Sequence, residues 1–460
     1  MQAMTFDECE ELLISWAKNE RLEEKLDFSA EKGAFSFPQP PQGEGALDPD
    51  EASKRPAHEV ADVFRLYGEE YRSKHTLTSE QARAMHDIEH CRTAEMGEHW
   101  DVCDMCGHIE KSYCSCHNRH CPKCHGAARR IWVRDRLNDL LPVPYYHVVF
   151  TLPDEELHAL YPYNEKLLYD LLFDCSAETL LLFGRDPKWL GAWMGFFGIL
   201  HTWGQTMWRH PHIHYVVPGG GINEAEEWVK AKFDDTFLFP VKALSMRFRK
   251  LFTEGLKEGF DAGLINFPPD WKHGESPKAF GEWLGKLGHK EFVVFTKAPL
   301  GGPEGVVKYV GRYTHRVAIS NHRILSIEGG VIRFSYKDYR SKDENGEYEW
   351  KEMSLEADEF IHRFLCHILP KGFHKIRHFG FLGNGKKAVL DRIKLYLLFE
   401  EGVGSIPGIE EKCGLDECGV RICPVCKVGG MLPVVVIHRY GTIVIRNLSF
   451  LRIVDSFNTS

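Results

Sequence analysis

Residues 202–221 read TWGQTMWRHPHIHYVVPGGG, and this stretch decides the fold that we expect. The run from His212 to Val217 is rich in β-branched and aromatic residues and leads to three glycines, which is typical of a strand. Residues two apart on a strand face the same side, so His212 and His214 project together while Ile213 turns into the core. Two such imidazoles form a clip for a divalent metal ion. Gln205, seven residues before the pair, is a candidate third ligand, because an adjacent antiparallel strand or its exit turn would bring its amide oxygen to the metal.

Other strand-like runs surround this one. They cover residues 145–151 (YYHVVFT), 195–200 and 291–296 (EFVVFT), whereas residues 155–182 have a helical period. A meander is expected over residues 323–355, with turns at Gly329-Gly330 and Asn345-Gly346. We therefore predict an α+β fold in which helices flank an antiparallel sheet.

Two tyrosines occur four residues apart in the segment KYVGRYTHR, residues 308–316. On a helix, Tyr309 and Tyr313 share a face, because residues four apart lie one above the other. Lys308, Arg312 and Arg316 recur at the same spacing beside them, which suits a helix that faces phosphates. Half-buried packing is the alternative for such amphipathic rings.

Most cysteines cluster in pairs separated by two residues, which indicates metal thiolates rather than disulfides in a long chain. The knuckles Cys103-x2-Cys106 and Cys121-x2-Cys124 have fourteen residues between them and predict one closed, structural four-cysteine zinc site. The string CPKCH also matches c-type haem attachment, but the flanking knuckle explains its cysteines better. Nearby candidates for a second zinc site are Cys91, Cys116 and His120.

A further knuckle, Cys423-x2-Cys426, lies near the other end of the chain. Together with Cys413 and Cys418 it predicts a small C-terminal zinc ribbon, unless those two cysteines are incidental. The length of 460 residues allows several domains. We expect an acidic helical extension with a linker (1–80), a zinc-binding DNA-docking domain (85–140), a catalytic domain (144–400) and the C-terminal zinc ribbon (405–445).

The formal net charge of −9 is a weak indication against nucleic acid as a partner. Much of the negative charge lies in the amino-terminal third, however, so basic segments elsewhere remain candidates for phosphate contacts. Besides the basic residues next to the tyrosines, these candidates are Arg129, Arg130, Arg134, Arg377 and Lys386. No stretch is apolar for long enough to span a membrane, and the acidic amino terminus is unlike a signal peptide, so we expect a cytoplasmic protein.

The chain resembles the IS91 family of insertion-sequence transposases over roughly residues 85–430. The resemblance rests on five blocks in family order, which read CDMCGHIEKSYCSCHNRHCPKCHGAARRIW, YYHVVFTLP, TWGQTMWRHPHIHYVVPGGG, KYVGRYTHRVAISNHR and FLCHILPKGFHKIRHFGFLGNGK. These transposases are related to rolling-circle replication initiators and relaxases that carry a histidine-hydrophobic-histidine (HUH) motif.

The resemblance implies an HUH-type nuclease core in which Tyr309 and Tyr313 are the nucleophiles. It implies that His212 and His214 bind the catalytic metal ion, with Gln205 as the third ligand. The expected cofactors are Mg²⁺ or Mn²⁺ for catalysis and Zn²⁺ for structure. The implied reaction cleaves and rejoins single-stranded DNA at transposon ends and target sites through a 5′-phosphotyrosine, in rolling-circle transposition.

Three other functions fit parts of the sequence. A rolling-circle replication initiator or relaxase-like nickase would share the chemistry and differ in its biology. A plain metal-dependent nuclease would use water as the nucleophile and leave no protein–DNA adduct. A non-catalytic zinc-dependent DNA-binding regulator would leave DNA intact. The cysteine clusters and the family blocks together favour the transposase.

Overall fold

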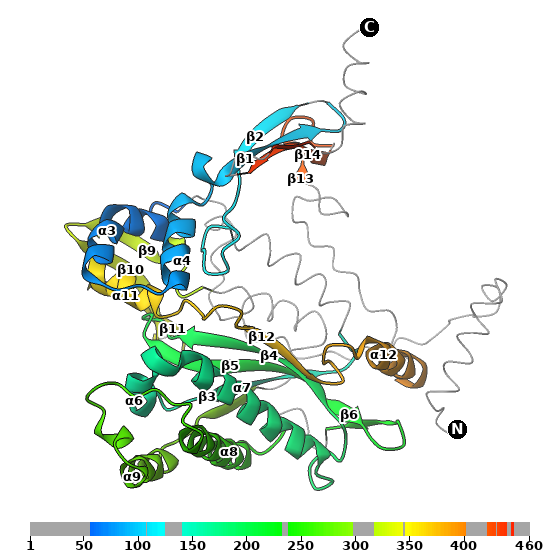
Figure 1. Cartoon of the computed structure of the whole chain (residues 1–460). Helices are drawn as coiled ribbons and strands as arrows, with labels where there is room; N and C mark the ends of the chain where they lie inside the picture. Colours follow the sequence, from blue (N-terminus) through cyan, green and yellow to red (C-terminus); the bar gives the residue numbers. More distant parts are fainter. Residues whose placement is uncertain are drawn as a thin grey trace, which may run out of the picture. The chain divides into compact units, whose positions relative to one another are not determined.

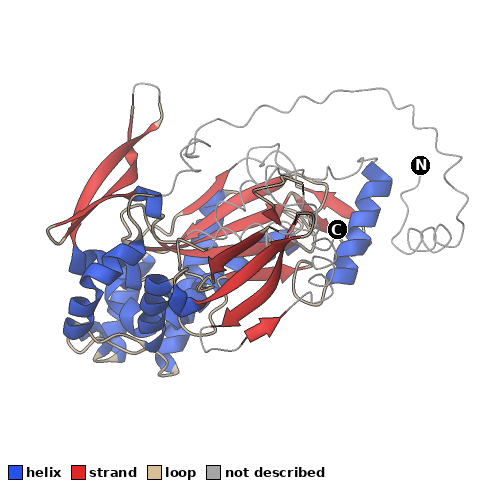
Figure 2. Cartoon of the chain, turned by 90° about the horizontal axis from the view of Figure 1, so that it is seen from above, coloured by secondary structure: helices blue, strands red, loops and turns tan. Residues whose placement is uncertain are grey.

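The computed structural model describes residues 56–106, 108–124, 140–231, 238–297, 317–343, 346–401, 421–428, 430–438 and 443–445. The chain divides into two compact units, each assembled from separate stretches of sequence. Unit 1 comprises residues 1–47, 129–316 and 369–407, and unit 2 comprises residues 48–128, 317–368 and 408–460. Helices and strands both contribute (Figure 2), and the mixed fold with antiparallel sheets is as predicted.

Unit 1 is built around a five-stranded sheet in which every pair of neighbours is antiparallel. The strand order is β12-β4-β5-β3-β8, so the strand that carries the histidine pair lies in the middle (Figure 1). The strands are β3 (Tyr145–Thr151), β4 (Gly195–Trp203), β5 (Arg209–Pro218), β8 (Val294–Lys297) and β12 (Ile376–Gly380).

One face of this sheet carries the main hydrophobic core. The long helices α7 (Tyr161–Arg185) and α8 (Val241–Asp261) pack against it, with α9 (Pro277–Gly288) beside α8. Ile213 is fully buried in this core, as strand alternation predicts. Complete burial of such a side chain contributes roughly 1.5–3 kcal/mol, so the core holds the face of β5 opposite to the histidines firmly in place.

The other face of the sheet is covered at one end by α12 (Lys387–Glu401). Leu390, Ile393 and Leu397 of this helix cluster with Phe197 and Val216 of the sheet. Shorter elements complete unit 1. They are α6 (Asp154–Leu157), β6 (Gly220–Ile222) and β7 (Trp228–Lys230), of which the last two form a small separate ladder.

Unit 2 contains a helical layer and a three-stranded meander. The helices are α3 (Val60–Lys74), α4 (Ser79–His90) and α11 (Ala357–Leu365), and the strands are β9 (Ile324–Glu328), β10 (Val331–Lys342) and β11 (Tyr348–Glu356). Gly329 and Gly330 both have positive φ and form the predicted tight turn between β9 and β10. None of the described helices in either unit is long and apolar enough to cross a membrane.

A second sheet of unit 2 joins strands that lie far apart in the sequence. Its strands are β1 (Gly97–Cys103), β2 (Ile109–Tyr113), β13 (Arg421–Ile422), β14 (Gly430–His438) and β15 (Ile443–Ile445). Strand β14 pairs antiparallel with β1, from Gly97 opposite His438 to Cys103 opposite Met431. The sequence predicted that the C-terminal strands form a small ribbon of their own. Instead, they complete the sheet that begins with β1 and β2.

Candidate metal centres

Three histidines gather on the face of the central sheet of unit 1 that lies opposite to the main hydrophobic core. His212 on β5 lies directly opposite His201 on β4, and His214 follows two residues later on β5. Directly opposed residues of antiparallel strands share a face, so all three imidazoles project to the same side. One ring nitrogen from each lies within 4.8 Å of the others. The sheet thus presents three imidazoles that can hold one metal ion.

Hydrogen bonds define which ring nitrogens face the metal position. Nδ1 of His212 donates to the backbone carbonyl of His210 at 2.6 Å, which leaves Nε2 with the lone pair. Nδ1 of His214 lies 2.8 Å from Nε2 of His147 on β3. If His214 binds the metal through Nε2, its Nδ1 carries the hydrogen and donates a hydrogen bond to Nε2 of His147. Metal-binding histidines typically make such a second hydrogen bond.

Burial favours the neutral form of His212. The His201 and His214 side chains are buried, and His212 is half-buried. Burial and the neighbouring His210 imidazole lower the pKa of His212 to about 3. A neutral imidazole is the form that binds metal ions, so protons do not compete for His212 near neutral pH.

His201 was missed by sequence reasoning, and Gln205 remains a predicted ligand. The expected strand ended at residue 200, one residue before His201, whereas β4 continues to Trp203. Gln205 lies half-buried in the turn between β4 and β5. A strand extended by one residue would have placed His201 opposite His212, but the sequence carries no strong local signal for where β4 ends.

The cysteines assemble in two groups that differ from the expected pairing. Cys103 and Cys106 do not share a group with Cys121 and Cys124. One group consists of Cys103, Cys106, Cys423 and Cys426, and the other of Cys91, Cys116, Cys121 and Cys124. Within each group the sulfur atoms lie within 4.8 Å of one another. Each knuckle therefore completes its set with cysteines that sequence spacing did not connect to it.

The second group is largely enclosed. Cys91 lies at the end of α4, and Cys91, Cys121 and Cys124 are buried. Sγ of Cys116 lies 3.7 Å from Sγ of Cys124, a separation suited to two thiolates on one zinc ion and too long for a disulfide. His120, which sequence reasoning offered as a ligand, does not belong to this group. Four thiolates fill a tetrahedral shell, so this group is suited to a structural role.

Several predicted site residues lie outside the described part of the chain. They are both tyrosines, Tyr309 and Tyr313, with Lys308, Arg312 and Arg316 beside them; the basic residues Arg129, Arg130 and Arg134; and the cysteines Cys413 and Cys418. Their predicted roles therefore remain predictions.

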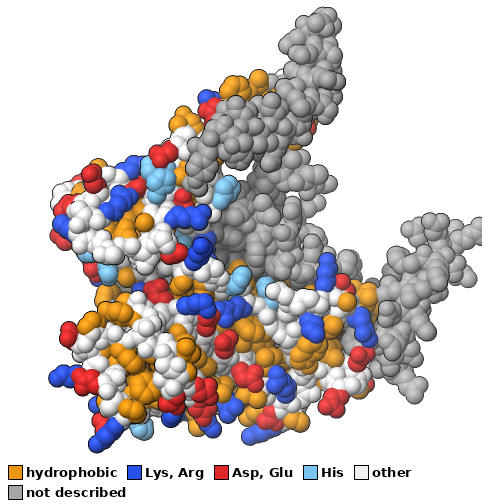
Figure 3. All heavy atoms as spheres, in the orientation of Figure 1, with side chains coloured by type: hydrophobic (Ala, Val, Ile, Leu, Met, Phe, Trp, Pro, Cys, Tyr) orange, Lys and Arg blue, Asp and Glu red, His pale blue; other side chains and the backbone are white. Residues whose placement is uncertain are grey.

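The two remaining basic candidates lie in unit 1. Arg377 on β12 binds Asp170 of α7, lies 3.7 Å from Asp174 and stacks over the ring of Phe173. Lys386 is exposed, with its ammonium group 6.0 Å from the centre of the Trp193 ring. In Figure 3, acidic and basic side chains are interspersed over the described surface of unit 1. Arg377 is thus occupied in tying β12 to α7, whereas Lys386 is accessible.

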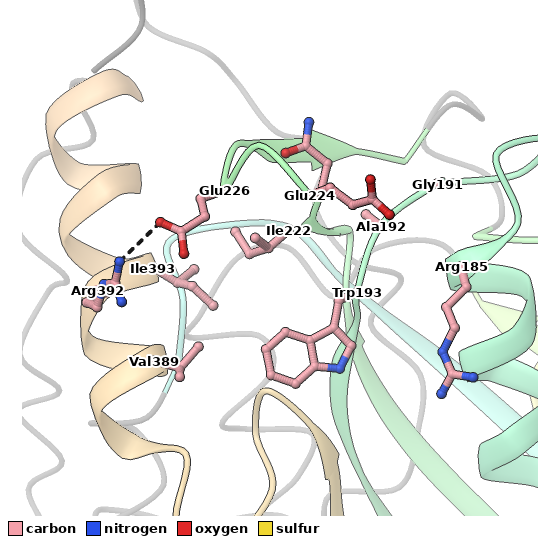
Figure 4. Close-up of a pocket in the computed structure, with 11 residues that line it drawn as sticks. Arg185, Gly191, Ala192, Trp193, Ile222, Glu224, Glu226, Val389, Arg392 and Ile393 are labelled. Carbon is pink, nitrogen blue, oxygen red and sulfur yellow. Dashed lines mark hydrogen bonds and ion pairs between the residues drawn. The ribbon is translucent and has the colours of Figure 1, made fainter. Parts of the chain in front are cut away.

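A separate cavity of about 600 Å³ lies at the other end of β4 (Figure 4). Trp193 lines it just before β4 begins, and Glu226 and Arg392, which form an ion pair at 3.1 Å, line one side of it. Strand β4 spans about 20 Å from Gly195, next to the cavity, to His201 in the histidine cluster, so the two sites are well separated. The cavity holds none of the predicted site residues, so the histidine cluster is the better candidate for chemistry.

Two family models match the chain. A model described as a putative transposase matches residues 195–388, which include all three clustered histidines. A model described as a transposase zinc-binding domain matches residues 63–152.

Two curated relatives are similar over most of their length. A putative transposase of Sinorhizobium fredii is 50% identical over 332 residues, which cover 72% of this chain and 81% of the relative. The transposase for insertion sequence element IS801 of Pseudomonas savastanoi pv. phaseolicola is 31% identical over 297 residues, which cover 64% of this chain and 68% of the relative. No solved structure matches the chain.

Proposed function

Since the chain belongs to the IS91 family of transposases, we propose that it cleaves and rejoins single-stranded DNA with a divalent cation held by His201, His212 and His214. The main support is that three imidazoles from adjacent strands come together inside the region that the putative-transposase model matches. An antiparallel sheet with the histidine pair on its middle strand supports an HUH-type nuclease core.

The donor set fits a catalytic divalent ion. Mn²⁺ and Mg²⁺ take up about six ligands, so three imidazoles, with or without Gln205, leave coordination positions for a phosphate. Neutral imidazoles also leave the full charge of the cation in place. When bound, the cation polarises a non-bridging oxygen of the scissile phosphate. Imidazole ligands favour Mn²⁺ over Mg²⁺, which prefers oxygen, and Gln205 is the predicted source of such an oxygen.

The covalent step follows from the family resemblance. The phenol oxygen of Tyr309 or Tyr313 attacks phosphorus and gives up its proton, the bond from phosphorus to the 3′ oxygen breaks, and that oxygen takes up a proton in exchange. The products are a 5′-phosphotyrosine and a free 3′-hydroxyl. Because one phosphate ester replaces another, a 3′-hydroxyl can later reverse the step without ATP. Two tyrosines allow the enzyme to hold donor and target strands in turn, as rolling-circle transposition requires.

The test is to incubate the full-length protein with labelled single-stranded DNA from a transposon end and Mn²⁺, and to look for a denaturant-resistant adduct. We expect the wild-type protein to form it and the double variant Tyr309→Phe/Tyr313→Phe to form none. Each single tyrosine variant then identifies which phenol attacks the transposon end. The matched control is Tyr339→Phe, which removes an exposed phenol of β10.

Two outcomes would contradict the proposal. Cleavage without an adduct in every variant would indicate attack by water, as in a plain nuclease. Binding without cleavage under any divalent ion would indicate a zinc-dependent regulator.

A further inference from the structure

Two hairpins, separated by more than 300 residues in sequence, carry the cysteines of the first group in unit 2. Cys103 ends β1 and Cys106 lies in the turn that leads to β2. In the same way, Cys423 follows β13 and Cys426 lies in the turn that leads to β14. Each hairpin therefore supplies two thiols from its turn.

The distances between the hairpins match those of a zinc site. Sγ of Cys103 lies 3.6 Å from Sγ of Cys426, and Sγ of Cys106 lies 3.7 Å from Sγ of Cys423. Two sulfurs bound at about 2.3 Å to one tetrahedral zinc ion lie about 3.8 Å apart. A disulfide would require about 2.05 Å, so oxidised pairs do not explain the geometry.

Backbone N–H groups also point at the sulfurs. Those of Met105 and Cys106 lie 3.4 and 3.5 Å from Sγ of Cys103, and that of Val425 lies 3.4 Å from Sγ of Cys423. Such donors stabilise thiolates, the form in which cysteine binds zinc. Each hairpin is thus shaped for a metal-bound thiolate and not merely for two buried thiols.

The backbone fastens the two hairpins together beside the thiols. The N–H of Asp104 donates to the carbonyl of Gly430 at 3.0 Å, and the N–H of Gly430 donates to the carboxylate of Asp104 at 2.8 Å. Strand β1 pairs with β14 over its whole length. The approach of the four sulfurs therefore follows from strand pairing as well as from the cysteines themselves.

We propose that these four thiolates bind one zinc ion, which closes a single zinc ribbon from two hairpins more than 300 residues apart. Cys423 and Cys426 lie outside both regions that the family models match. The C-terminal knuckle is accordingly part of the first zinc-binding region, and the shell is full without Cys413 or Cys418. Because the two knuckles are more than 300 residues apart, this site can form only after Cys426 has been synthesised.

Zinc content of purified full-length variants tests the pairing. We expect Cys103→Ser and Cys423→Ser each to lose one zinc ion per chain relative to wild type. The double variant should also lose only one, because both residues serve the same ion. Cys121→Ser/Cys423→Ser should lose two, and Cys413→Ser should lose none. The control is Cys366→Ser, a thiol of unit 2 that belongs to neither group.

Loss of two zinc ions from Cys103→Ser/Cys423→Ser, with one lost from each single variant, would overturn the proposal. A ligand-preserving series covers the case in which the serine variants do not fold. In the Co²⁺-substituted double variant Cys103→His/Cys423→His we expect absorption from one unchanged four-sulfur site and one site with two sulfurs and two nitrogens. Two sites with three sulfurs each would mean that the knuckles bind different ions.

Discussion

The histidine cluster of unit 1 and the cysteine groups of unit 2 offer a metal ion opposite kinds of ligand set. The histidine cluster has three neutral ligands from two adjacent strands, and they can leave coordination positions open. Each cysteine group offers four thiols, which as thiolates would close the tetrahedral shell of a zinc ion and more than offset its charge. The comparison teaches that the number and charge of the ligands distinguish a site whose ion can bind a substrate from a site whose ion only stabilises the fold.

Replacing His212 by Ala removes one ligand of the histidine cluster and has the largest expected effect. An ion that polarises a phosphate contributes several kcal/mol to transition-state stabilisation, so we expect DNA cleavage to fall by about 10²- to 10³-fold. Zinc content and melting temperature should stay near wild-type values, because the cysteine groups are untouched. The matched control is His289→Ala, an exposed histidine at the end of α9. Full cleavage by His212→Ala would remove the histidine cluster from the mechanism.

Brief treatment with a chelator compares the two kinds of site in one sample. The three-ligand ion should leave within minutes, whereas the four-cysteine ions, whose coordination shells are full, should remain. We expect cleavage to fall by about a hundredfold or more and to return when Mn²⁺ is added, with the zinc content unchanged. Simultaneous loss of zinc and activity, without recovery in Mn²⁺ alone, would show that the sites do not differ in this way.

His147→Ala sharpens the comparison by testing the support of the histidine cluster. Nε2 of His147 lies 2.8 Å from Nδ1 of His214, and loss of such a partner typically weakens metal affinity by about 10- to 100-fold. The measurement is the Mn²⁺ concentration that gives half-maximal cleavage. His147→Gln retains an acceptor near that position and should recover part of the affinity. Equal defects in both variants, together with a lowered melting temperature, would indicate a packing role alone.

Arg377→Met has the smallest expected effect. It tests the attachment of β12 to α7, in the sheet that carries the histidine cluster. Arg377 binds Asp170 and stacks on Phe173, so its loss should lower the free energy of unfolding by about 2 kcal/mol. Cleavage and DNA affinity should change little at a temperature where the variant is folded. A large loss of DNA affinity without loss of stability would instead assign Arg377 to DNA binding.

The same ion pair predicts a dependence on acid. Burial raises the pKa of Asp170, but hydrogen bonds from Arg377 and Lys166 outweigh it and hold the pKa below its ordinary value of 3.8. A carboxylate with a lowered pKa stabilises the fold fully above its unfolded pKa, and this contribution is lost as the pH falls through the lower, folded value. Urea denaturation below pH 4 should therefore show a smaller acid-induced loss in Arg377→Met than in wild type.

Much of the candidate site could be predicted where ligands are close in sequence. Strand alternation placed His212 and His214 on one face and Ile213 in the core, and the glycine pair at residues 329–330 placed a turn. The third histidine could not be found in this way. Whether His201 lies opposite His212 depends on where β4 ends and on its register with β5, and neither has a local signal strong enough to decide it.

The sequence by itself determined the kinds of ligand and their local geometry, because two or three residues of backbone suffice to aim a His-x-His pair or a Cys-x2-Cys knuckle. Only the tertiary structure decided which of these short pieces meet. Cys103 and Cys106 have Cys121 and Cys124 close by in sequence, yet their partners are Cys423 and Cys426. The physical reason is that backbone hydrogen bonds between β1 and β14 bring the distant knuckle into place, and proximity along the chain carries no comparable information about pairing.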